Sequence, residues 1–312
     1  MKKAFRISLG LLCLILVMLT LMACNSNTVT EAAKREVPAL DREGFPISVP
    51  EEINTIISIG PSNTEILVAL GFLDAIIQAD MFSFDVPGIN ADICTYDMMA
   101  PDFEHIISLA PDIVFVTGFT RAEGEDGLYS QIEAAGISVI NITYANSIND
   151  IKEDIRFIGA VMDAESKAQA LISELDAEIN RIKEISSSIV DKKLVYFELS
   201  PAPWMWSFGT GTFLNEMMEI AGAVNIMAAY EGWTGLGDEV IFELNPDVIL
   251  TSTNFIDDPI GEIKSRPGWE NITAVQNDAV FYIDTNSSNR QTHNITRALR
   301  EIAEAVYPDR FQ

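Results

Sequence analysis

One sequence unit occurs twice in this chain and constrains its fold more than any other feature. Residues 104–113 read E-H-I-I-S-L-A-P-D-I, and residues 239–248 read E-V-I-F-E-L-N-P-D-V. In each copy the apolar spacing favours a short helix, the proline ends it, and the apolar residues that start after the aspartate favour a buried strand. The duplication predicts two similar lobes, each displaying one glutamate, Glu104 or Glu239.

Strands and helices alternate through both halves of the chain. The expected strands are residues 55–59, 75–79, 113–116 and 137–142 in the first half and 194–199, 248–251 and 280–283 in the second. The expected helices outside the repeat units are residues 66–71, after a turn at residues 61–65, and residues 127–135, 147–162, 212–221 and 292–306. Such alternation predicts an α/β fold in which each lobe has a mainly parallel central sheet covered on both faces.

A long helix is expected between the two lobes. Residues 163–187 contain neither glycine nor proline, apolar residues recur every three or four positions, and Asp163 stands where an N-cap is expected. A fully helical segment of this length extends roughly 37 Å. A coiled-coil segment is the competing interpretation, although the apolar stripe is short for one. We therefore expect one rigid helix, residues 163–188, to join an N-terminal lobe of residues 46–162 to a C-terminal lobe of residues 189–312.

The first residues of the chain have the layout of a secretory signal. Basic residues precede an apolar run that is short for a membrane span and ends in L-M-A-C at residues 21–24. This tetrapeptide resembles the lipobox of bacterial lipoproteins, which implies cleavage before Cys24 and lipidation of its thiol. An ordinary signal peptide followed by an incidental cysteine is the alternative. We expect residues 1–23 to be removed and residues 24–45 to tether the protein to the extracytoplasmic face of the cell membrane.

The charge and the cysteines limit the partners further. The formal net charge is −26, and removal of the signal, which holds three basic residues and no acids, makes it more negative. Nucleic acid and anionic lipid surfaces repel such a chain, so the lipid anchor is the expected contact with the membrane. Of three cysteines, Cys94 is the one expected to remain as a free thiol, which leaves no intramolecular disulfide. We expect a monomer whose fold depends on its core.

Several motifs resemble those of one protein family. They are D-x-x-G-x-x-I-x-V-P at residues 41–50, I-I-S-I-G-P-S-N-T-E-I-L at residues 56–67, the two repeat units, and F-L-N-E at residues 213–216. Together they span essentially the whole chain from residue 41. The chain resembles the substrate-binding proteins of ABC importers for iron-siderophore complexes, haem and vitamin B12. The resemblance implies two lobes joined by a long helix, a ligand held between them, and a permease dimer with its ATPase as the partner.

Glu104 and Glu239 match the positions that, in this family, form salt bridges to arginines of the two permease subunits. A carboxylate on the rim of each lobe can steer and register a docking partner without a large buried area. The competing interpretation is that both are first-turn acids favoured by the helix dipole. The duplication and the resemblance together favour docking. Glu65 and Glu216 also open helices, and we interpret them as structural acids.

Aromatic and thioether side chains collect in segments that are expected to be loops at strand ends, where an α/β lobe usually binds its ligand. The candidate ligand-binding residues are Phe82, Tyr96, Met98, Trp204, Trp206 and Trp233, with Arg121 and Arg290 as cationic candidates and His293 as a further one. His293 either caps the last helix or reaches the cleft as a haem axial ligand. Each aromatic could equally be a core residue, and each arginine a solvated one. As a group these residues favour a large, partly apolar or planar ligand.

Motifs for other chemistries do not occur in the sequence. Two histidines are too few for a typical site for bare zinc or manganese, and there is no G-x-S-x-G elbow, phosphate-binding loop or C-x-x-C pair. We therefore expect no enzymatic activity and no cofactor, with iron or cobalt entering only in the ligand. The sequence predicts a substrate-binding lipoprotein of an ABC importer for a large metal chelate, with iron-siderophore first, cobalamin second and haem third. A membrane-anchored hydrolase and a ligand-sequestering or sensing lipoprotein without transport are the alternatives.

Overall fold

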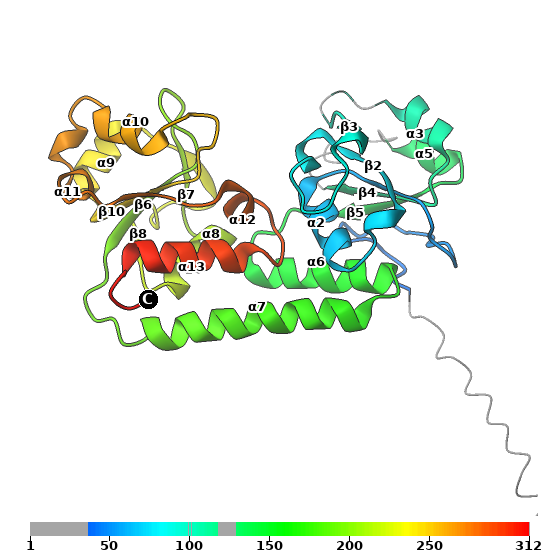
Figure 1. Cartoon of the computed structure of the whole chain (residues 1–312), viewed down its shortest axis with the longest axis horizontal. Helices are drawn as coiled ribbons and strands as arrows, with labels where there is room; N and C mark the ends of the chain where they lie inside the picture. The colour runs from blue at the N-terminus through cyan, green and yellow to red at the C-terminus, as the bar shows by residue number, and fades with distance from the viewer. Residues whose placement is uncertain (1–36, 99, 101, 118–128, 312) are drawn as a thin grey trace, which may run out of the picture. The chain divides into compact units, whose positions relative to one another are not determined.

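The first half of the chain forms a five-stranded parallel sheet. The computed structural model describes residues 37–98, 100, 102–117 and 129–311 (Figure 1). The strands are β1 (Ile56–Ser58), β2 (Ile76–Asp80), β3 (Cys94–Tyr96), β4 (Ile113–Thr117) and β5 (Ser138–Ile142), in the spatial order β3-β2-β1-β4-β5. The central strands β1 and β4 are buried along nearly all of their length, which explains their continuous apolar sequences.

The second half forms a similar but smaller arrangement. A four-stranded parallel sheet has the order β11-β10-β6-β8, and a separate antiparallel pair joins β7 to β9. The strands are β6 (Leu194–Glu198), β7 (Trp206–Phe208), β8 (Val224–Asn225), β9 (Trp233–Gly235), β10 (Val248–Thr251) and β11 (Val280–Tyr282). We call β1 to α6 the N-lobe and β6 to α13 the C-lobe. The predicted α/β fold with parallel central sheets is confirmed.

Helices alternate with these strands, as the sequence pattern predicts. The N-lobe contains α2 (Pro61–Ala69), α3 (Phe103–Leu109), α5 (Ser130–Ala134) and α6 (Ile148–Val161). The long α7 (Glu165–Ser186) follows. The C-lobe contains α8 (Phe213–Ile220), α9 (Asp238–Leu244), α10 (Pro259–Ser265), α11 (Thr273–Gln276), α12 (Thr285–Asn289) and α13 (Ile295–Val306). Short 3-10 turns complete the set, among them Met81–Ser83 after β2.

The repeated sequence unit forms the same structure in both lobes. α3 and α9 each contain seven residues, and each is followed by a residue in the left-handed conformation, Ala110 with φ 47° and Asn245 with φ 43°. This left-handed residue, rather than the proline after it, ends the helix. The strands β4 and β10 then enter the centres of the two sheets. The two lobes are therefore similar even in the conformation of the residue that ends each of these helices.

The helix α7 contacts both lobes. Near its first turn the Lys167 Nζ donates a hydrogen bond of 2.7 Å to the carbonyl of Leu70 in the N-lobe. At its last turn the Ser186 Oγ donates one of 2.7 Å to the carbonyl of Ile220 in the C-lobe. Its buried face consists of Ala168, Ile172, Leu175, Ile179, Ile182 and Ser186. Leu171 and Ile185, which are apolar residues of the same helix, are only half-buried.

The expected caps of the two central helices have different outcomes. Ser147 caps α6 as predicted, in a capping box with Asp150. Asp163 does not cap α7, because it adopts a left-handed conformation with φ 54° and Ala164 occupies the cap position without a side-chain hydrogen bond. The last helix begins at Ile295 rather than Thr292. The residues before it are used in contacts with the N-lobe, which are described below.

The tether, expected at residues 24–45, ends earlier in the sequence than predicted. Its last residues belong to the folded part of the chain: Asp41 is buried and its carboxylate accepts hydrogen bonds from the backbone N–H groups of Glu43 and Phe45. Arg42 forms an ion pair of 2.6 Å with Asp154 on α6. Buried polar contacts of this kind require a fixed backbone, so order begins before Phe45.

One apolar cluster runs through both lobes. It contains Ile56 of β1, Ile151 of α6, Leu175 of α7, Val195 of β6 and Leu299 of α13, among other residues. The lobes therefore share a core through the helices that connect them, in addition to separate clusters on the far face of each sheet. Of the helices that the structure describes, none has both the length and the apolar character that crossing a membrane requires.

Candidate functional site

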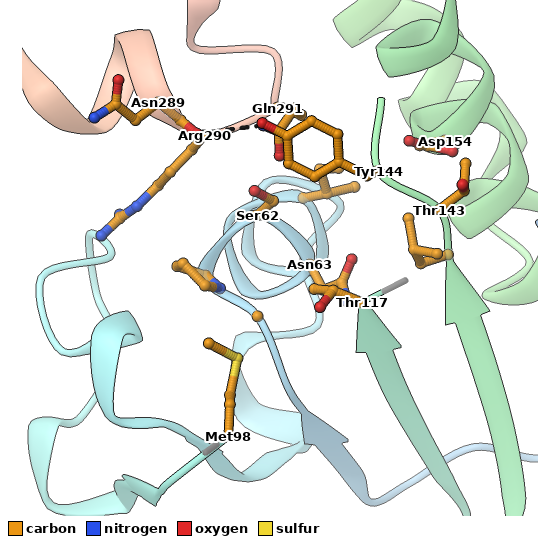
Figure 2. Close-up of a pocket in the computed structure, with 14 residues that line it drawn as sticks. Ser62, Asn63, Met98, Thr117, Thr143, Tyr144, Asp154, Asn289, Arg290 and Gln291 are labelled. Atoms are coloured by element: carbon orange, nitrogen blue, oxygen red, sulfur yellow. Dashed lines mark hydrogen bonds between the residues drawn. The ribbon is translucent and has the colours of Figure 1, made fainter. Parts of the chain in front are cut away.

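A cavity lies where strand ends of the N-lobe meet a segment of the C-lobe. Its volume is about 220 Å³. The residues around it are Gly60 to Asn63 and Ile66 of α2 and its approach, Met98, Thr117, Ile142 to Tyr144, Asp154 of α6, and Asn289 to Gln291 between α12 and α13 (Figure 2). The carboxyl ends of parallel strands are a usual place for ligands in α/β folds. We therefore take this interlobe cavity as the candidate site.

The turn from β1 into α2 shapes one wall of the interlobe cavity. Gly60 has φ 107°, and a Cβ atom there would lie 2.1 Å from the Cγ2 of Thr117, so both the backbone conformation and the close approach of β4 require glycine. The Gly60 N–H donates a hydrogen bond of 2.9 Å to the buried carboxylate of Asp80 at the end of β2. This fixed turn brings Ser62 and Asn63 to the cavity.

Arg290 crosses from the C-lobe to the N-lobe at the edge of the interlobe cavity. Its guanidinium lies 3.3 Å from the carboxylate of Glu65 on α2 and 2.6 Å from that of Asp85, and it donates a hydrogen bond of 3.0 Å to the carbonyl of Phe82. The Thr292 Oγ1 donates to the other oxygen of Glu65 at 2.5 Å. Burial opposes ionisation of Asp85, but Arg290 and Asn286 outweigh it and lower the pKa of Asp85 below its ordinary value.

Tyr144 connects the two lobes on the other side of the interlobe cavity. It follows β5, and its ring lies edge-to-face against Trp233 of β9 with centroids 6.1 Å apart. Its hydroxyl is hydrogen-bonded to the side chain of Gln291. Trp233 in turn packs against Phe208 and Phe213 of the C-lobe. An aromatic chain of contacts therefore runs from the C-lobe core to the cavity wall.

Asp154 is the buried acid of the interlobe cavity. Its burial raises its pKa to about 7, although the hydrogen bond and charge of Arg42 oppose the rise. A carboxyl group with such a pKa changes its charge near neutral pH. Among the residues that the structure describes, no group of three or more His, Cys, Asp or Glu side chains is arranged to hold a metal ion. The groups present on the cavity wall are hydroxyls, amides, a thioether and paired charges.

The structure places the predicted ligand-binding residues in several different environments. Met98 and Arg290 line the interlobe cavity. Phe82 lies at its edge through the carbonyl that accepts from Arg290, while its ring is half exposed. Tyr96 is a core residue of the N-lobe, which contradicts the expected cleft position because its ring belongs to a buried apolar cluster. Arg121 lies outside the described residues, as does Cys24.

The three other aromatic candidates are tryptophans, and they do not form one surface. Trp204 lies in the turn before β7 and is 77% exposed, whereas Trp206 is in β7 and is 47% exposed. The strand begins only at Trp206, so Trp204 lies outside it. Neither residue lines the interlobe cavity, and Trp233 reaches it only through Tyr144.

His293 lies against the long helix rather than in the interlobe cavity. It lines a separate cavity with Glu174 and Glu178 of α7 and Arg300 of α13. Burial lowers the pKa of His293, while the carboxylates of Glu65 and Glu174 oppose this effect. It is not the cap of α13, since Asn294 holds that position without a side-chain hydrogen bond.

The two repeat glutamates occupy equivalent exposed positions. Glu104 lies in the first turn of α3 and Glu239 in the first turn of α9, and both side chains are exposed. The helix-dipole explanation and the docking explanation both fit this placement. Glu216, read as a structural acid, accepts a hydrogen bond of 2.8 Å from the backbone N–H of Ile148 and so links α8 to the start of α6.

Sequence reasoning missed several residues of the site. Asp85, Tyr144 and Asp154 were not singled out, and Glu65 was assigned a local helix role although it binds Arg290. A charged residue within an apolar helix, as Glu65 is within α2, is a signal that could have pointed to a buried partner. The identity of that partner has no signature in the sequence.

Comparison with known proteins identifies the family. A family model described as periplasmic binding protein matches residues 56–286, from the first strand of the N-lobe into α12. The chain belongs to the periplasmic binding protein family. This periplasmic binding protein is 31% identical over 277 residues to YvrC of Bacillus subtilis, named an ABC transporter substrate-binding lipoprotein, and the match covers 87% of this chain and 86% of that one. The resemblance seen in the motifs is thus confirmed.

Solved structures agree with this assignment. One described as a possible iron-binding (periplasmic solute-binding) protein from Staphylococcus epidermidis has a TM-score of 0.72 and 26% identity, and the match covers 82% of this periplasmic binding protein and 100% of that chain. The molybdate-bound protein MolA of Haemophilus influenzae has a TM-score of 0.73 at 21% identity, with 87% and 91% covered. The second likeness shows the shared fold.

Proposed function

We propose that this protein is the substrate-binding component of an ABC importer, which captures a metal chelate between its lobes and delivers it to a permease dimer with its ATPase. The observation that carries the proposal is the interlobe cavity, whose wall combines Asn63 and Tyr144 of the N-lobe with Gln291 of the C-lobe. A site built from two lobes can respond to its ligand by a change in their separation. Family membership and the similarity to a substrate-binding lipoprotein support the same role.

The proposed location is the extracytoplasmic face of the membrane, with a lipid on Cys24 as the anchor. The motif at residues 21–24 and the lipoprotein name of the Bacillus subtilis relative support this part of the proposal. The acidic chain is repelled by anionic lipid, so a covalent lipid is the contact that holds it there.

The proposed ligand is a ferric siderophore first, cobalamin second and haem third. Proteins similar to this chain are named for cobalamin, iron uptake, haem and molybdate, which supports a metal complex as the ligand class. The hydroxyl and amide groups of Ser62, Asn63 and Thr143 suit a ligand rich in hydrogen-bonding oxygens, such as a ferric hydroxamate. Haem is third because His293, the candidate axial ligand, faces the cavity beside α7.

The size of the interlobe cavity implies a rearrangement on binding. Its volume of about 220 Å³ is below the range of roughly 300–1,000 Å³ in which drug-sized ligands are bound. A whole chelate therefore requires the cavity to enlarge. The long helix and the shared apolar cluster limit wide separation of the lobes, so we expect a small rocking motion and local movement of the wall.

The proposed docking contacts with the permease are Glu104 and Glu239. They lie in the first turns of equivalent helices, one in each lobe, and their side chains are exposed. A pair of carboxylates at matching positions can bind two arginines of a permease dimer and fix the orientation of the binding protein.

The experiment that tests the proposed function begins with the absorption spectrum of the protein purified from its native host. A ferric hydroxamate, a corrin and a porphyrin have different visible bands. Calorimetric titration of the ligand-free protein with ferrioxamine B, cyanocobalamin, haemin and molybdate then measures each affinity. We expect one chelate to bind with a dissociation constant of about 1 μM or tighter, corresponding to about −8 kcal/mol. Turnover of an ester or amide substrate without binding of any chelate would favour the anchored hydrolase instead.

A further inference from the structure

The segment 286–292, between the start of α12 and the approach to α13, contacts the N-lobe through three residues. Arg290 contacts Glu65 and Asp85, Thr292 donates to Glu65, and the amide of Asn286 donates a hydrogen bond of 2.7 Å to Asp85. The two partners of each contact are more than two hundred positions apart in the sequence. Glu65 and Arg290, for example, are separated by 225 positions. We call this set of contacts the interlobe latch.

The interlobe latch is buried at its centre. Glu65 is 6% exposed and Arg290 is 8% exposed, while Asp85 lies at the rim. Removing one partner of a buried charge pair leaves the other charge without compensation, so the pair favours a single arrangement strongly. Arg290 also donates to the carbonyl of Phe82, which extends the contact to the 3-10 turn after β2.

The interlobe latch adjoins the interlobe cavity, and Arg290 belongs to both. Asn289 and Gln291, on either side of Arg290, line the cavity, and so do Ser62 and Asn63, which lie in the same helix as Glu65. The ion pair therefore ties the C-lobe wall of the cavity to the helix that forms the N-lobe wall. Gln291 reaches the hydroxyl of Tyr144 from this position.

We propose that Glu65 and Asp85 are positioning residues for ligand binding, which hold Arg290 so that Asn289 and Gln291 face the ligand. The role of Arg290 is to close the cavity rather than to contact the ligand, because its guanidinium is already bound to two carboxylates and a carbonyl. Ligand release requires the interlobe latch to open. This inference rests on the proposed binding function of the cavity.

The opening motion that follows is local. The apolar cluster through α6, α7 and α13 holds the lobes together on the helix side, whereas the interlobe latch consists of polar contacts at the cavity. When the two lobes separate at the cavity, water can solvate both partners of each polar contact, whereas nothing compensates exposure of the apolar cluster. The interlobe latch is therefore the contact between the lobes that opens first.

The first test measures the interlobe latch without any ligand. Hydrogen exchange of the full-length protein in detergent, followed by mass spectrometry, reports opening of peptides that cover 286–292 and 60–66. Glu65→Gln and Arg290→Met should raise exchange in both peptides at least tenfold, and Arg290→Lys, which keeps the charge but loses the two-sided contact, should restore part of the protection. Glu216→Gln is the matched control, since it removes the charge of another carboxylate that contacts the opposite lobe but does not line the cavity.

The second test measures the ligand. Stopped-flow dissociation is recorded with whichever of ferrioxamine B, cyanocobalamin, haemin or molybdate binds the wild-type protein. Glu65→Gln should raise the dissociation rate about tenfold, a change of about 1.4 kcal/mol, and Glu216→Gln should leave it within a factor of two. If Glu65→Gln fails to fold, two milder variants replace it. Thr292→Val removes the hydrogen bond to Glu65, and Asp85→Asn removes the charge that faces Arg290, and each should raise the rate in the same direction.

The outcomes separate the interlobe latch from the proposed function. Unchanged exchange in Glu65→Gln and Arg290→Met overturns the latch, whether or not a chelate binds. Raised exchange with an unchanged dissociation rate overturns the positioning role. If none of the four probes binds the wild-type protein, the metal-chelate function fails, while the exchange result still decides whether the latch exists.

Discussion

Asp112 and Asp247 have the same role in the two lobes. The Asp112 carboxylate accepts the backbone N–H groups of Asn54 and Thr55, at 2.8 and 2.9 Å, immediately before β1. The Asp247 carboxylate accepts the backbone N–H of Leu194, at 2.8 Å, at the start of β6. Because β4 pairs with β1 and β10 pairs with β6, each aspartate fixes the start of two adjacent strands. The aspartate of the repeated unit is thus a structural residue of the duplicated lobe.

The first prediction concerns this pair of aspartates. Asp112→Ala should lower the free energy of unfolding by about 2 kcal/mol, because hydrogen bonds to a charged acceptor contribute more than neutral ones. Asp247→Ala should cost less, since the Asp247 carboxylate accepts a hydrogen bond from one backbone N–H, whereas that of Asp112 accepts from two. Urea unfolding followed by circular dichroism measures both. Asp92→Ala, at an exposed position, is the control, and an equal loss in the control would contradict the prediction.

The second prediction is the pH dependence of the same contact. The backbone N–H of Asn54 lowers the pKa of Asp112 in the folded protein, with burial opposing and Thr55 adding to the effect. Because the pKa of Asp112 is lower in the folded protein, its carboxylate stabilises the fold at pH values above the unfolded-state pKa of about 3.9. This stabilisation is lost as the pH falls through the folded-state pKa. Wild type should therefore lose more stability than Asp112→Ala between about pH 5 and pH 2. Parallel curves of stability against pH for the two proteins would show that the Asp112 carboxylate does not cause the loss of stability at low pH.

The third prediction concerns docking. Glu104→Arg with Glu239→Arg should abolish most ligand uptake and most stimulation of the permease ATPase, because both carboxylates would become repulsive toward arginines. Ligand affinity should change by less than a factor of two, since neither residue lines the interlobe cavity. Glu184→Arg, an exposed acid near the end of α7, controls for the added positive charge. Uptake that survives the double reversal would leave both glutamates with the helix-dipole role alone.

The fourth prediction concerns the anchor. Cys24→Ala should release the protein from the membrane fraction or leave its signal uncleaved, because a thiol is required for lipidation and the acidic chain has no other strong attraction to anionic lipid. Fractionation and electrophoretic mobility measure both results. Cys94→Ala is the matched control, and it should stay with the membrane. A Cys24→Ala protein of unchanged mobility in the membrane fraction would disprove lipidation.

The fifth prediction concerns fluorescence. Trp233 contacts Tyr144, which lines the interlobe cavity, so binding of a chelate should change the emission of Trp233. Trp233→Phe should remove most of the change, whereas Trp204→Phe, at a position that is 77% exposed, should retain it. Trp204 and Trp206 were candidate ligand-binding residues, but neither lines the cavity, so we expect little response from them. A change in emission that persists in Trp233→Phe would indicate that the ligand contacts the exposed residues Trp204 and Trp206 instead.

Local patterns in the sequence were sufficient for most of the longer elements. The elements that they did not predict are β3, β7, β8, β9, α10, α11 and α12. The spacing of apolar residues predicts α7, Ser147 with Asp150 predicts the start of α6, and the repeat predicts the equivalence of α3 with α9. These features depend on neighbours within a few positions, where helix periodicity and capping act directly. The failure at Asp163 has a local cause as well, because a left-handed backbone at that residue moved the cap to Ala164.

The site depended on tertiary structure. Composition suggested an aromatic cleft, but the fold put Tyr96 in the core, left Trp204 exposed and brought Tyr144 to the interlobe cavity instead. A side chain near a strand end can face the cavity, the core or the solvent, and small differences in backbone direction decide which of these it faces.

The sequence by itself determined two α/β lobes, the long helix between them and the matching placement of Glu104 and Glu239, because each of these follows from periodicity and repetition along the chain. Only the tertiary structure decided that Glu65 and Arg290 meet, across 225 positions of sequence. Their pairing requires α2 and the approach to α13 to lie side by side, which depends on how both lobes pack on the helices between them. Charge complementarity between distant residues exists for many pairs in such an acidic chain, and folding selects those that can be buried, among them Glu65 with Arg290.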